Sequence, residues 1–479
     1  MKKLFLFLLA GLLVLVAVVL FNTFRMESKQ VHVDALPAPE VNPQALQHFQ
    51  KALSFKTISY GDSSLFDSTQ FIGFRDFLET TYPNFHSKLT REIIAGYSLL
   101  YTWKGKNPDL KPVVLMAHQD VVPIEEATKA MWTVDPFAGE VKDGFIWGRG
   151  TTDDKINLIS IVEAAEKLLA ENFQPERTIY FSFGHDEEIG GKGAIAAAAL
   201  LKSRNIEAEF IMDEGGYITL DKMPGITKPL ALLGTSEKGY LSLNLSVEQA
   251  GGHSSMPAEE TSIDILAKAL VNLRSKPFPS DLTGSTLEGT AYIGPEMPFI
   301  QKMAFANLWL FKDLVISNYE KSPQSAAMVR TTMVPTIIDA GIKDNVIPTV
   351  ATATVNLRLL PGDLSDDVIE QVKNKMNDDR VKIQRLTFNA EASAVTPAAS
   401  TGYSKIDQSV KKSYPQTITT PFLMIGATDS RFFGDVSKNI IKFSPMIDPI
   451  GFHGIDERVS VESYKTALWF YENLIKDLN

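Results

Sequence analysis

Short apolar segments alternate with helix-like segments in the first half of the chain, and this alternation constrains the fold most strongly. Residues 113–117, 178–183 and 209–212 have the β-branched and aromatic composition of buried strands. They are separated by residues 158–169, whose apolar side chains have helical spacing, and by the alanine-rich residues 193–202. Strands that alternate with helices predict a mostly parallel sheet covered by helices.

The pattern changes near residue 237, and the change predicts a second, inserted domain. A chain of 479 residues exceeds what one hydrophobic core usually fills. Strand-like segments (241–247, 351–359, 381–386) here alternate with helix-like ones (261–274, 366–377), which is typical of an α+β sandwich with an antiparallel sheet. A strand at 422–425 and a helix at 462–476 then resume the first pattern. We therefore expect a first domain over 44–236 and 391–479, with residues 237–390 inserted into it.

Residues 297–319 of the insert contain many large apolar side chains. One interpretation is a helix pair that is buried in the second domain or forms a dimer contact. The alternative is a wall that accommodates a long apolar group of a substrate.

The N-terminus predicts a membrane anchor. Lys2 and Lys3 precede an unbroken apolar run over residues 4–21, which is close to the length that spans a bilayer. This run is longer than the core of most cleaved signal peptides and lacks a clear A-x-A cleavage site. We expect a signal anchor over 1–24, a stalk over 25–43 and an extracytoplasmic main body, with secretion after signal cleavage as the alternative.

Composition excludes several classes of site. The formal net charge of −10, without a long basic run, argues against nucleic acid as a partner. The chain contains no cysteine, which excludes disulfides, thiolate nucleophiles and cysteine-ligated zinc. Any metal must therefore be held by Asp, Glu and the seven His residues.

Histidine and carboxylates gather where the expected strands end. His118 and Asp120 follow the first strand, residues 184–188 (GHDEE) the second and Asp213 the third, while Asp153 precedes a helix. Because ligands bind outside the carboxyl ends of strands in α/β sheets, these groups are expected to meet. So many carboxylates repel one another unless cations lie between them.

Imidazole and carboxylate ligands suit Zn²⁺. The residues that we expect to bind two zinc ions, with one carboxylate as a bridge, are His118, Asp153, Glu188, Asp213 and His453, the last because it lies between glycines. Of the adjacent Glu187 and Glu188, one can bind metal while the other accepts a proton from water. Asp120 shares a strand face with His118 and can hold its second ring nitrogen.

Several strings, in this order, resemble the dizinc peptidase family of carboxypeptidase S, aminoacylase, carnosinase and glutamate carboxypeptidase. They are HQDVVP, WGRGTTDDK, GHDEEIGG, DEGG, GGHSSMP, NVIP and GATDSRFF. SEKG, TVNLRLLPG and TDSRFF resemble the branch that holds carboxypeptidase S and the N-fatty-acyl-amino-acid synthase/hydrolases. The resemblance covers nearly all of the chain after the stalk. It implies a mostly parallel-sheet catalytic domain with an inserted α+β sandwich that serves as lid and dimerisation domain.

The resemblance also implies roles at the metal site. His118, Asp153 and Asp213 would bind one zinc ion, and Asp153, Glu188 and His453 the other. Glu187 would be the general base, Asp120 would support His118, and the peptide between Asp153 and Asp154 would be cis.

In the lid, the resemblance assigns His253 to oxyanion stabilisation, often across a homodimer, and Asn345 to substrate contact. Arg358 would clamp the substrate carboxylate, which the loop with Gly426, Thr428 and Arg431 also receives.

Together these features predict an exported dizinc hydrolase that cleaves an amide next to a free carboxylate. The expected substrates are N-acyl amino acids, including N-fatty-acyl ones, with reverse synthesis at the same site; the alternative is a carboxypeptidase or dipeptidase that trims short peptides. A non-catalytic relative would be expected to lack the base or a ligand, whereas Glu187 and all five ligand positions are present.

Overall fold

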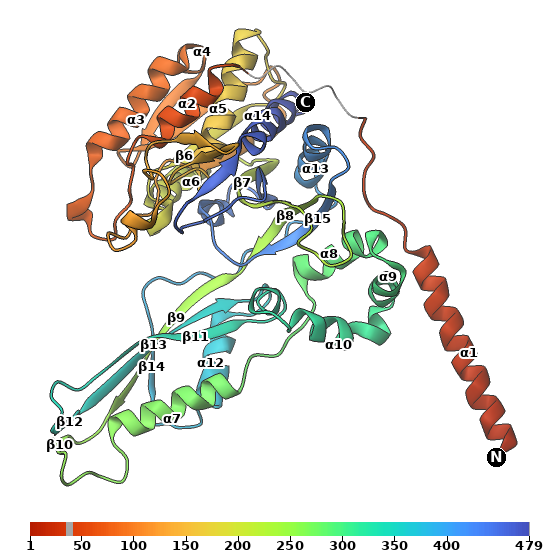
Figure 1. The fold of residues 1–479 in the computed structure, drawn as a ribbon, viewed down its shortest axis with the longest axis vertical. Helices are drawn as coiled ribbons and strands as arrows, with labels where there is room; N and C mark the ends of the chain where they lie inside the picture. The colour runs from red at the N-terminus through yellow and green to blue at the C-terminus, as the bar shows by residue number, and fades with distance from the viewer. Residues whose placement is uncertain (35–41, 479) are drawn as a thin grey trace.

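The large sheet is mixed and mostly parallel. The computed structural model describes residues 1–34 and 42–478 (Figure 1). Among these residues, the large sheet has the strand order β1-β2-β6-β3-β7-β16-β8-β15. Its strands are β1 (Thr90–Ile94), β2 (Ser98–Trp103), β3 (Val113–His118), β6 (Ile179–Gly184), β7 (Phe210–Thr219), β8 (Leu230–Glu237), β15 (Ile418–Met424) and β16 (Ile440–Ile447). The run β6-β3-β7-β16 is parallel, as is β8-β15, which confirms the predicted fold class.

Alternate residues of β3 face two different cores. Leu115 and its odd-numbered neighbours pack in the core that includes α5 (Lys155–Ala170) and α14 (Val461–Lys476). Val114 and Met116 pack on the other face, where the alanine-rich α6 (Lys192–Ser203) lies. A strand that is apolar on both faces must be covered on both, so the sheet lies between layers of helices.

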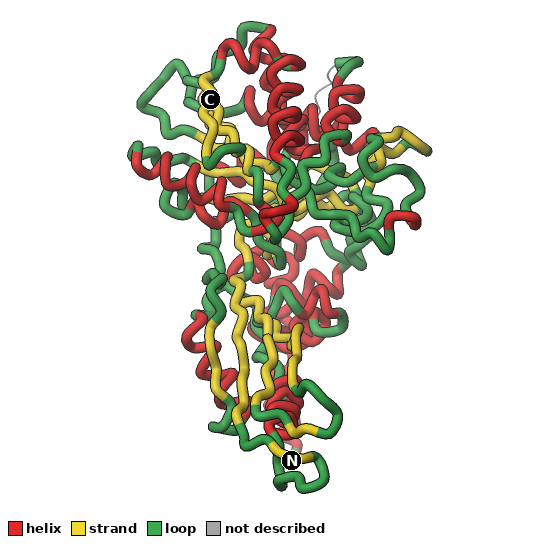
Figure 2. The backbone as a smooth tube through the Cα atoms, turned by 90° about the vertical axis from the view of Figure 1, so that its left-hand side faces the viewer, coloured by secondary structure: helices red, strands yellow, loops and turns green. Residues whose placement is uncertain are grey.

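The small sheet is antiparallel and extends away from the large one (Figure 2). Its order among the described residues is β11-β13-β9-β14, from β9 (Gly239–Glu248), β11 (Thr332–Ala340), β13 (Val350–Leu359) and β14 (Lys382–Arg385). The helices α7 (Ser262–Ser275) and α12 (Ser365–Met376) pack on it, and their apolar side chains share one core with β9 and β13. The expected elements are present, and β11 is an additional strand that the sequence analysis did not predict.

A helical segment between α7 and β11 lies outside this small sheet. It comprises α8 (Gly284–Ile293), α9 (Phe299–Ala306), α10 (Leu308–Tyr319) and α11 (Pro323–Ala326). The expected helix pair at 297–319 is therefore present as α9 and α10: Val315 is buried in a small core with Leu282 and Val329, whereas Ile300, Trp309 and Leu314 are exposed. Helix α8 packs on β15, and α9 contacts the N-terminal helix α1 (Lys2–Arg25).

Part of the expected stalk, residues 35–41, lies outside the described residues. Before it, Gln30 donates a hydrogen bond to the Thr419 carbonyl (2.9 Å) and accepts one from the Thr419 amide (2.9 Å). The start of this segment therefore runs along the edge strand β15. The remaining elements are α2 (Ala45–Leu53), α3 (Ser68–Thr81), α4 (Pro83–Lys88), β4 (Glu140–Lys142), β5 (Phe145–Trp147), β10 (Gly252–His253), β12 (Val346–Ile347), α13 (Thr401–Ser413) and β17 (Arg458–Ser460).

Candidate metal centre

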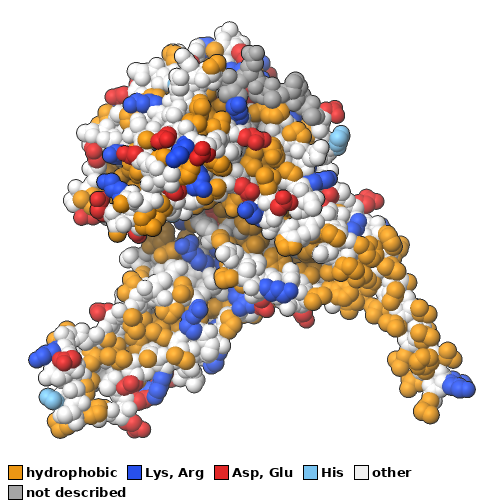
Figure 3. Space-filling view, in the orientation of Figure 1, with side chains coloured by type: hydrophobic (Ala, Val, Ile, Leu, Met, Phe, Trp, Pro, Cys, Tyr) orange, Lys and Arg blue, Asp and Glu red, His pale blue; other side chains and the backbone are white. Residues whose placement is uncertain are grey.

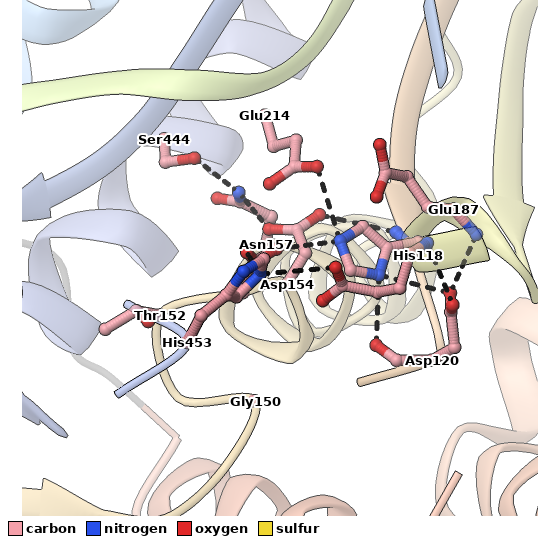
Figure 4. A network of polar contacts seen from close by, with 12 residues as sticks. His118, Asp120, Gly150, Thr152, Asp154, Asn157, Glu187, Glu214, Ser444 and His453 are labelled. Atoms are coloured by element: carbon pink, nitrogen blue, oxygen red, sulfur yellow. Dashed lines mark hydrogen bonds and ion pairs between the residues drawn. The ribbon is translucent and has the colours of Figure 1, made fainter. Parts of the chain in front are cut away.

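The carboxyl ends of three neighbouring parallel strands bring His118, the Glu187–Glu188 pair and Glu214 together. His118 is the last residue of β3, Glu187 and Glu188 follow β6, and Glu214 lies within β7. Asp153 comes from the loop before α5, and His453 from the loop between β16 and β17. Figure 4 shows Glu214, His118 and His453 directed toward one region.

His118, Asp153 and Glu214 form the first group of potential metal ligands. His118 Nε2 lies 2.8 Å from Asp153 Oδ1 and 3.3 Å from Glu214 Oε1. Two ligand atoms of one tetrahedral zinc ion, with bonds of 2.0–2.1 Å, lie about 3.3 Å apart. The spacing of these atoms therefore suits a single ion bound by all three residues.

Glu214, rather than the expected Asp213, is grouped with His118 and Asp153 in this structure. The Asp213 carboxylate accepts hydrogen bonds from the amides of Ser430 (2.8 Å) and Glu214 (3.0 Å). The carboxylates of Asp213 and Glu214 thus have different partners, Ser430 for the first and His118 for the second. In this structure Asp213 therefore contacts the loop that begins at Thr428, whereas Glu214 lies next to His118.

Asp153, Glu188 and His453 form the second group. His453 Nε2 lies 2.9 Å from Asp153 Oδ2 and 3.2 Å from Glu188 Oε2. The two oxygens of Asp153 thus face different histidines, as a bridging carboxylate requires. The peptide between Asp153 and Asp154 is cis, as the resemblance implied.

Asp120 connects the two groups. His118 Nδ1 donates to the backbone carbonyl of Asp120 (3.0 Å), which leaves Nε2 with its lone pair for a metal. The Asp120 carboxylate lies 3.3 Å from the same ring nitrogen and accepts hydrogen bonds from the amides of Glu187 and Glu188 (3.2 Å each). Ser59 also donates to it (2.6 Å). One buried carboxylate therefore orients His118 and the turn that carries Glu187 and Glu188.

The electrostatics of the site favour bound cations. Burial raises the pKa of Glu187 and of Glu214 well above the usual value, and nearby carboxylates raise both further. Burial lowers the pKa of His118, yet Glu214, Asp120 and Asp153 outweigh it and raise that pKa overall. Glu188 Oε1 is buried without a hydrogen-bond partner among the described residues. The site thus combines histidines, an excess of carboxylates and a buried Glu188 oxygen without a partner. This combination suits the binding of two divalent ions.

A buried ion pair joins the loops that carry Asp153 and His453. Glu457 Oε2 lies 2.5 Å from Arg149 Nη1, and Glu457 Oε1 accepts hydrogen bonds from the amides of Gly150 (3.0 Å) and Thr152 (2.8 Å). Arg149 also donates to the carbonyl of Gly454 (3.2 Å). Sequence reasoning missed Glu457, since a glutamate four residues after His453 has no distinctive spacing.

Arg358 and Arg431 lie close enough for their charges to interact, and both are next to aromatic rings. The guanidinium of Arg358 lies 4.6 Å from the centre of the Tyr240 ring, and that of Arg431 lies 5.5 Å from the centre of the Phe388 ring. Burial lowers the pKa of Arg358, and the charge of Arg431 lowers it further. These two expected carboxylate-binding residues therefore form a positively charged pair.

Thr428 has a structural partner. Its amide (3.1 Å) and hydroxyl (2.7 Å) donate to Glu237 Oε1, while Gly426 lies in the exposed segment just before it. The structure thus connects this loop to the end of β8.

His253 and Asn345 lie at the far end of the small sheet, away from the metal site of the same chain (Figure 1). His253 belongs to β10, which pairs with β12, and the amide of Ser254 donates to the Asn345 carbonyl (3.2 Å). Both residues are exposed. The structure brings these two predicted site residues next to each other, but it does not bring them to the ligands.

The comparisons with known proteins agree with this geometry. The model of peptidase family M20/M25/M40 matches residues 114–477. The chain belongs to this family. The M20 protein is therefore a metallohydrolase, and the family relationship covers both the sheet that carries the ligands and the inserted domain.

Two curated relatives match the M20 protein over most of their length. It is 40% identical to the probable carboxypeptidase S-like 2 of Dictyostelium discoideum, covering 98% of this chain and 92% of that protein. It is 39% identical to the human N-fatty-acyl-amino acid synthase/hydrolase PM20D1, covering 89% of this chain and 86% of that protein.

Solved structures share the fold at low sequence identity. The M20 family metallo-carboxypeptidase Sso-CP2 from Sulfolobus solfataricus has a TM-score of 0.67 at 18% identity, over 91% of this chain and 99% of that one. Human carnosine dipeptidase 1 has a TM-score of 0.61 at 15% identity, over 92% and 100%.

Proposed function

We propose that the M20 protein is a dizinc hydrolase of N-acyl amino acids, including N-fatty-acyl ones, and that it cleaves the amide next to the free carboxylate. The observation that carries this proposal is the pair of ligand groups that share Asp153, with Glu187 beside them. Since a catalyst accelerates a reaction in both directions, the same site also supports condensation of an acid with an amino acid.

The proposed ligands of one zinc ion are His118, Asp153 and Glu214, and those of the other are Asp153, Glu188 and His453. When bound there, zinc supplies Lewis acidity toward a carbonyl and lowers the pKa of water. Glu187 takes a proton from the attacking water and returns it to the leaving amine. A buried carboxylate with a raised pKa suits both steps, because it holds and releases a proton more evenly than an exposed glutamate.

Arg358 is proposed to bind the free carboxylate of the substrate, together with Arg431 and the loop of Gly426 and Thr428. Guanidinium groups bind carboxylates through paired hydrogen bonds, and the Tyr240 ring holds Arg358 in position. The positive charges of Arg358 and Arg431 also repel each other, and a bound substrate carboxylate would reduce this repulsion.

The acyl part of the proposal is supported by the relatives named as N-fatty-acyl-amino acid synthase/hydrolases. The carboxypeptidase S-like relative supports the second candidate, which is the trimming of short peptides. Both reactions need the same ligands and the same carboxylate pocket. They differ only in the acyl group that supplies the carbonyl of the cleaved amide.

A panel of substrates assayed with purified, metal-quantified protein tests the proposal. Oleoyl-phenylalanine, acetyl-phenylalanine, Gly-Leu and a pentapeptide are compared by kcat/KM, and oleate with phenylalanine tests synthesis. We expect oleoyl-phenylalanine to be the best substrate and two zinc ions to be present per chain. Turnover of peptides alone would favour the second candidate, and full activity without metal would contradict both.

We further propose that α1 anchors the protein in a membrane and that the main body is extracytoplasmic. Helix α1 is long and apolar enough to cross a bilayer, with a mean hydropathy of 3.3 over its most apolar window. The proposed oligomer is a homodimer formed through the small-sheet domain, because His253 and Asn345 could then approach the metal site of the second subunit.

A further inference from the structure

The helices α9 and α10 expose a set of large apolar side chains. Ile300 is 68% exposed, Trp309 60% and Leu314 63%, and the exposed Phe299 and Leu310 lie on the same two helices. Soluble proteins rarely leave large contiguous apolar patches uncovered. We call these five residues the apolar surface, and a partner of apolar chemistry would be needed to cover it.

The apolar surface is continuous with α1. Phe299 of the surface lies against Phe24 of α1, with ring centres 5.9 Å apart. Figure 3 shows hydrophobic side chains extending from the body of the protein onto this helix. The partner that surrounds α1 is therefore in a position to cover the apolar surface as well.

Helix α1 makes specific polar contacts with the junction of α9 and α10. Asn307, at the junction of α9 and α10, is fully buried. Its side-chain amide donates to the Val19 carbonyl (3.1 Å) and the Thr23 hydroxyl (3.3 Å), and its oxygen accepts from Asn22 (2.9 Å). Three hydrogen bonds therefore join α1 to the junction of α9 and α10.

The contact lies at the depth where α1 would leave a bilayer. A hydrocarbon core about 30 Å thick is crossed by about 20 helical residues. If Lys2 and Lys3 mark one face of the membrane, the apolar run from Leu4 reaches the other face near Thr23. The residues of α1 that contact α9 and α10 are at this end, so the apolar surface lies at the membrane interface, where tryptophan is enriched.

We propose that the apolar surface of α9 and α10 is a second membrane-contact site, which inserts into the outer leaflet of the phospholipid bilayer beside α1. It would hold the main body against the membrane rather than leaving it on a free stalk. The proposal rests on the membrane anchor proposed above and is independent of the substrate.

Quenching of tryptophan fluorescence by brominated lipid tests this site. The full chain is reconstituted in phosphatidylcholine vesicles with bromine on the acyl chains near the headgroup. The chain has five tryptophans, and α1 contains none of them. We expect strong quenching in the wild type and loss of most of it in Trp309→Phe, because Trp309 is the tryptophan on the apolar surface.

A double variant and a matched control separate insertion from general effects of added charge. Ile300→Glu combined with Leu314→Glu should reduce the quenching of Trp309, because carboxylates resist entry into lipid. Val271→Glu should not, since Val271 is 67% exposed but lies on α7 of the small-sheet domain.

Three results would overturn the proposal. The first is equal quenching with and without Trp309. The second is an unquenched Trp309 together with a dimer that the double variant dissociates, which would assign the surface to a second copy of the chain. The third is a mature chain whose intact mass lacks α1. The readout requires neither metal nor substrate, so its failure would leave the proposed reaction untouched.

Discussion

At the scale of single residues, the site depends on which carboxylates face the histidines. Asp153 presents one oxygen to His118 and the other to His453, and Asp120 orients His118 from behind. Strand alternation predicted that Asp120 supports His118, and the family resemblance implied that Asp153 is the bridging carboxylate. Residue type and strand ends could not decide between Asp213 and Glu214, because adjacent carboxylates have nearly the same sequence signal.

Replacing Glu187 by Gln should abolish turnover without removing metal. Glu187 belongs to neither ligand group, and glutamine cannot accept and return a proton. General acid–base catalysis contributes about 10²–10⁴-fold, so kcat should fall by that factor. Metal content and kcat are measured on the same preparation, and substantial remaining activity at full metal content would exclude Glu187 as the base.

Asp213→Asn and Glu214→Gln form a matched pair that tests the proposed ligand set. We expect Glu214→Gln to weaken binding of one metal ion by at least about tenfold, because a carboxylate near His118 is lost. Asp213→Asn should retain both ions, since its retained oxygen can still accept a hydrogen bond from Ser430. Metal titration monitored by calorimetry measures both, and the reverse order would restore Asp213 as the ligand.

Arg358→Ala should chiefly impair recognition of the substrate carboxylate. Loss of a charge-assisted hydrogen bond costs about 1.5–3 kcal/mol, which corresponds to roughly a 10–100-fold fall in kcat/KM. The matching methyl ester serves as a control substrate, because it lacks the charge. An unchanged preference for the free acid over the ester would argue against the proposed clamp.

At the scale of elements, loops rather than strands complete the metal site. The loop before α5 supplies Asp153 and the loop after β16 supplies His453. The buried Arg149–Glu457 pair joins these loops, so the distance between the two ligands depends on it.

Glu457→Gln should destabilise both loops. The change leaves the buried charge of Arg149 without its counterion, which costs about 3–5 kcal/mol. We expect a lower thermal midpoint and weaker metal binding, measured by calorimetry on holoprotein and apoprotein. Glu260→Gln, which removes the surface ion pairs of Glu260 with Lys268 and Arg380, is the control and should change little. A midpoint and affinity equal to those of the wild type would show that the pair does not position the site.

At the scale of the whole molecule, two predicted site residues lie far from the proposed metal ligands of the same chain. His253 and Asn345 are at the far end of the small-sheet domain, although the resemblance assigns them to catalysis (Figure 1). A second copy that supplied them would account for both observations.

Mixing two inactive variants tests this arrangement. His253→Ala and Glu187→Gln should each have little activity, whereas a hybrid dimer keeps one site with an intact Glu187 and an intact His253 from its partner. Random reassociation of equal amounts should restore about a quarter of the wild-type activity, because half of the dimers are hybrids with one intact site each. Activity no higher than that of the separate variants would place His253 outside the site or within its own chain.

The sequence by itself determined the fold class and most of the chemistry. The periodicity of apolar residues required a parallel sheet between helices, and the absence of cysteine restricted the ligands to histidine and carboxylate. Three findings needed the tertiary structure: the position of Glu214 beside His118, the contact of α1 with α9, and the distance of His253 from the metal site. All three depend on packing over distances that local sequence patterns do not encode. The first is the direction of a side chain in an irregular strand, the second is a contact between segments 285 residues apart, and the third is the position of the far end of an inserted domain.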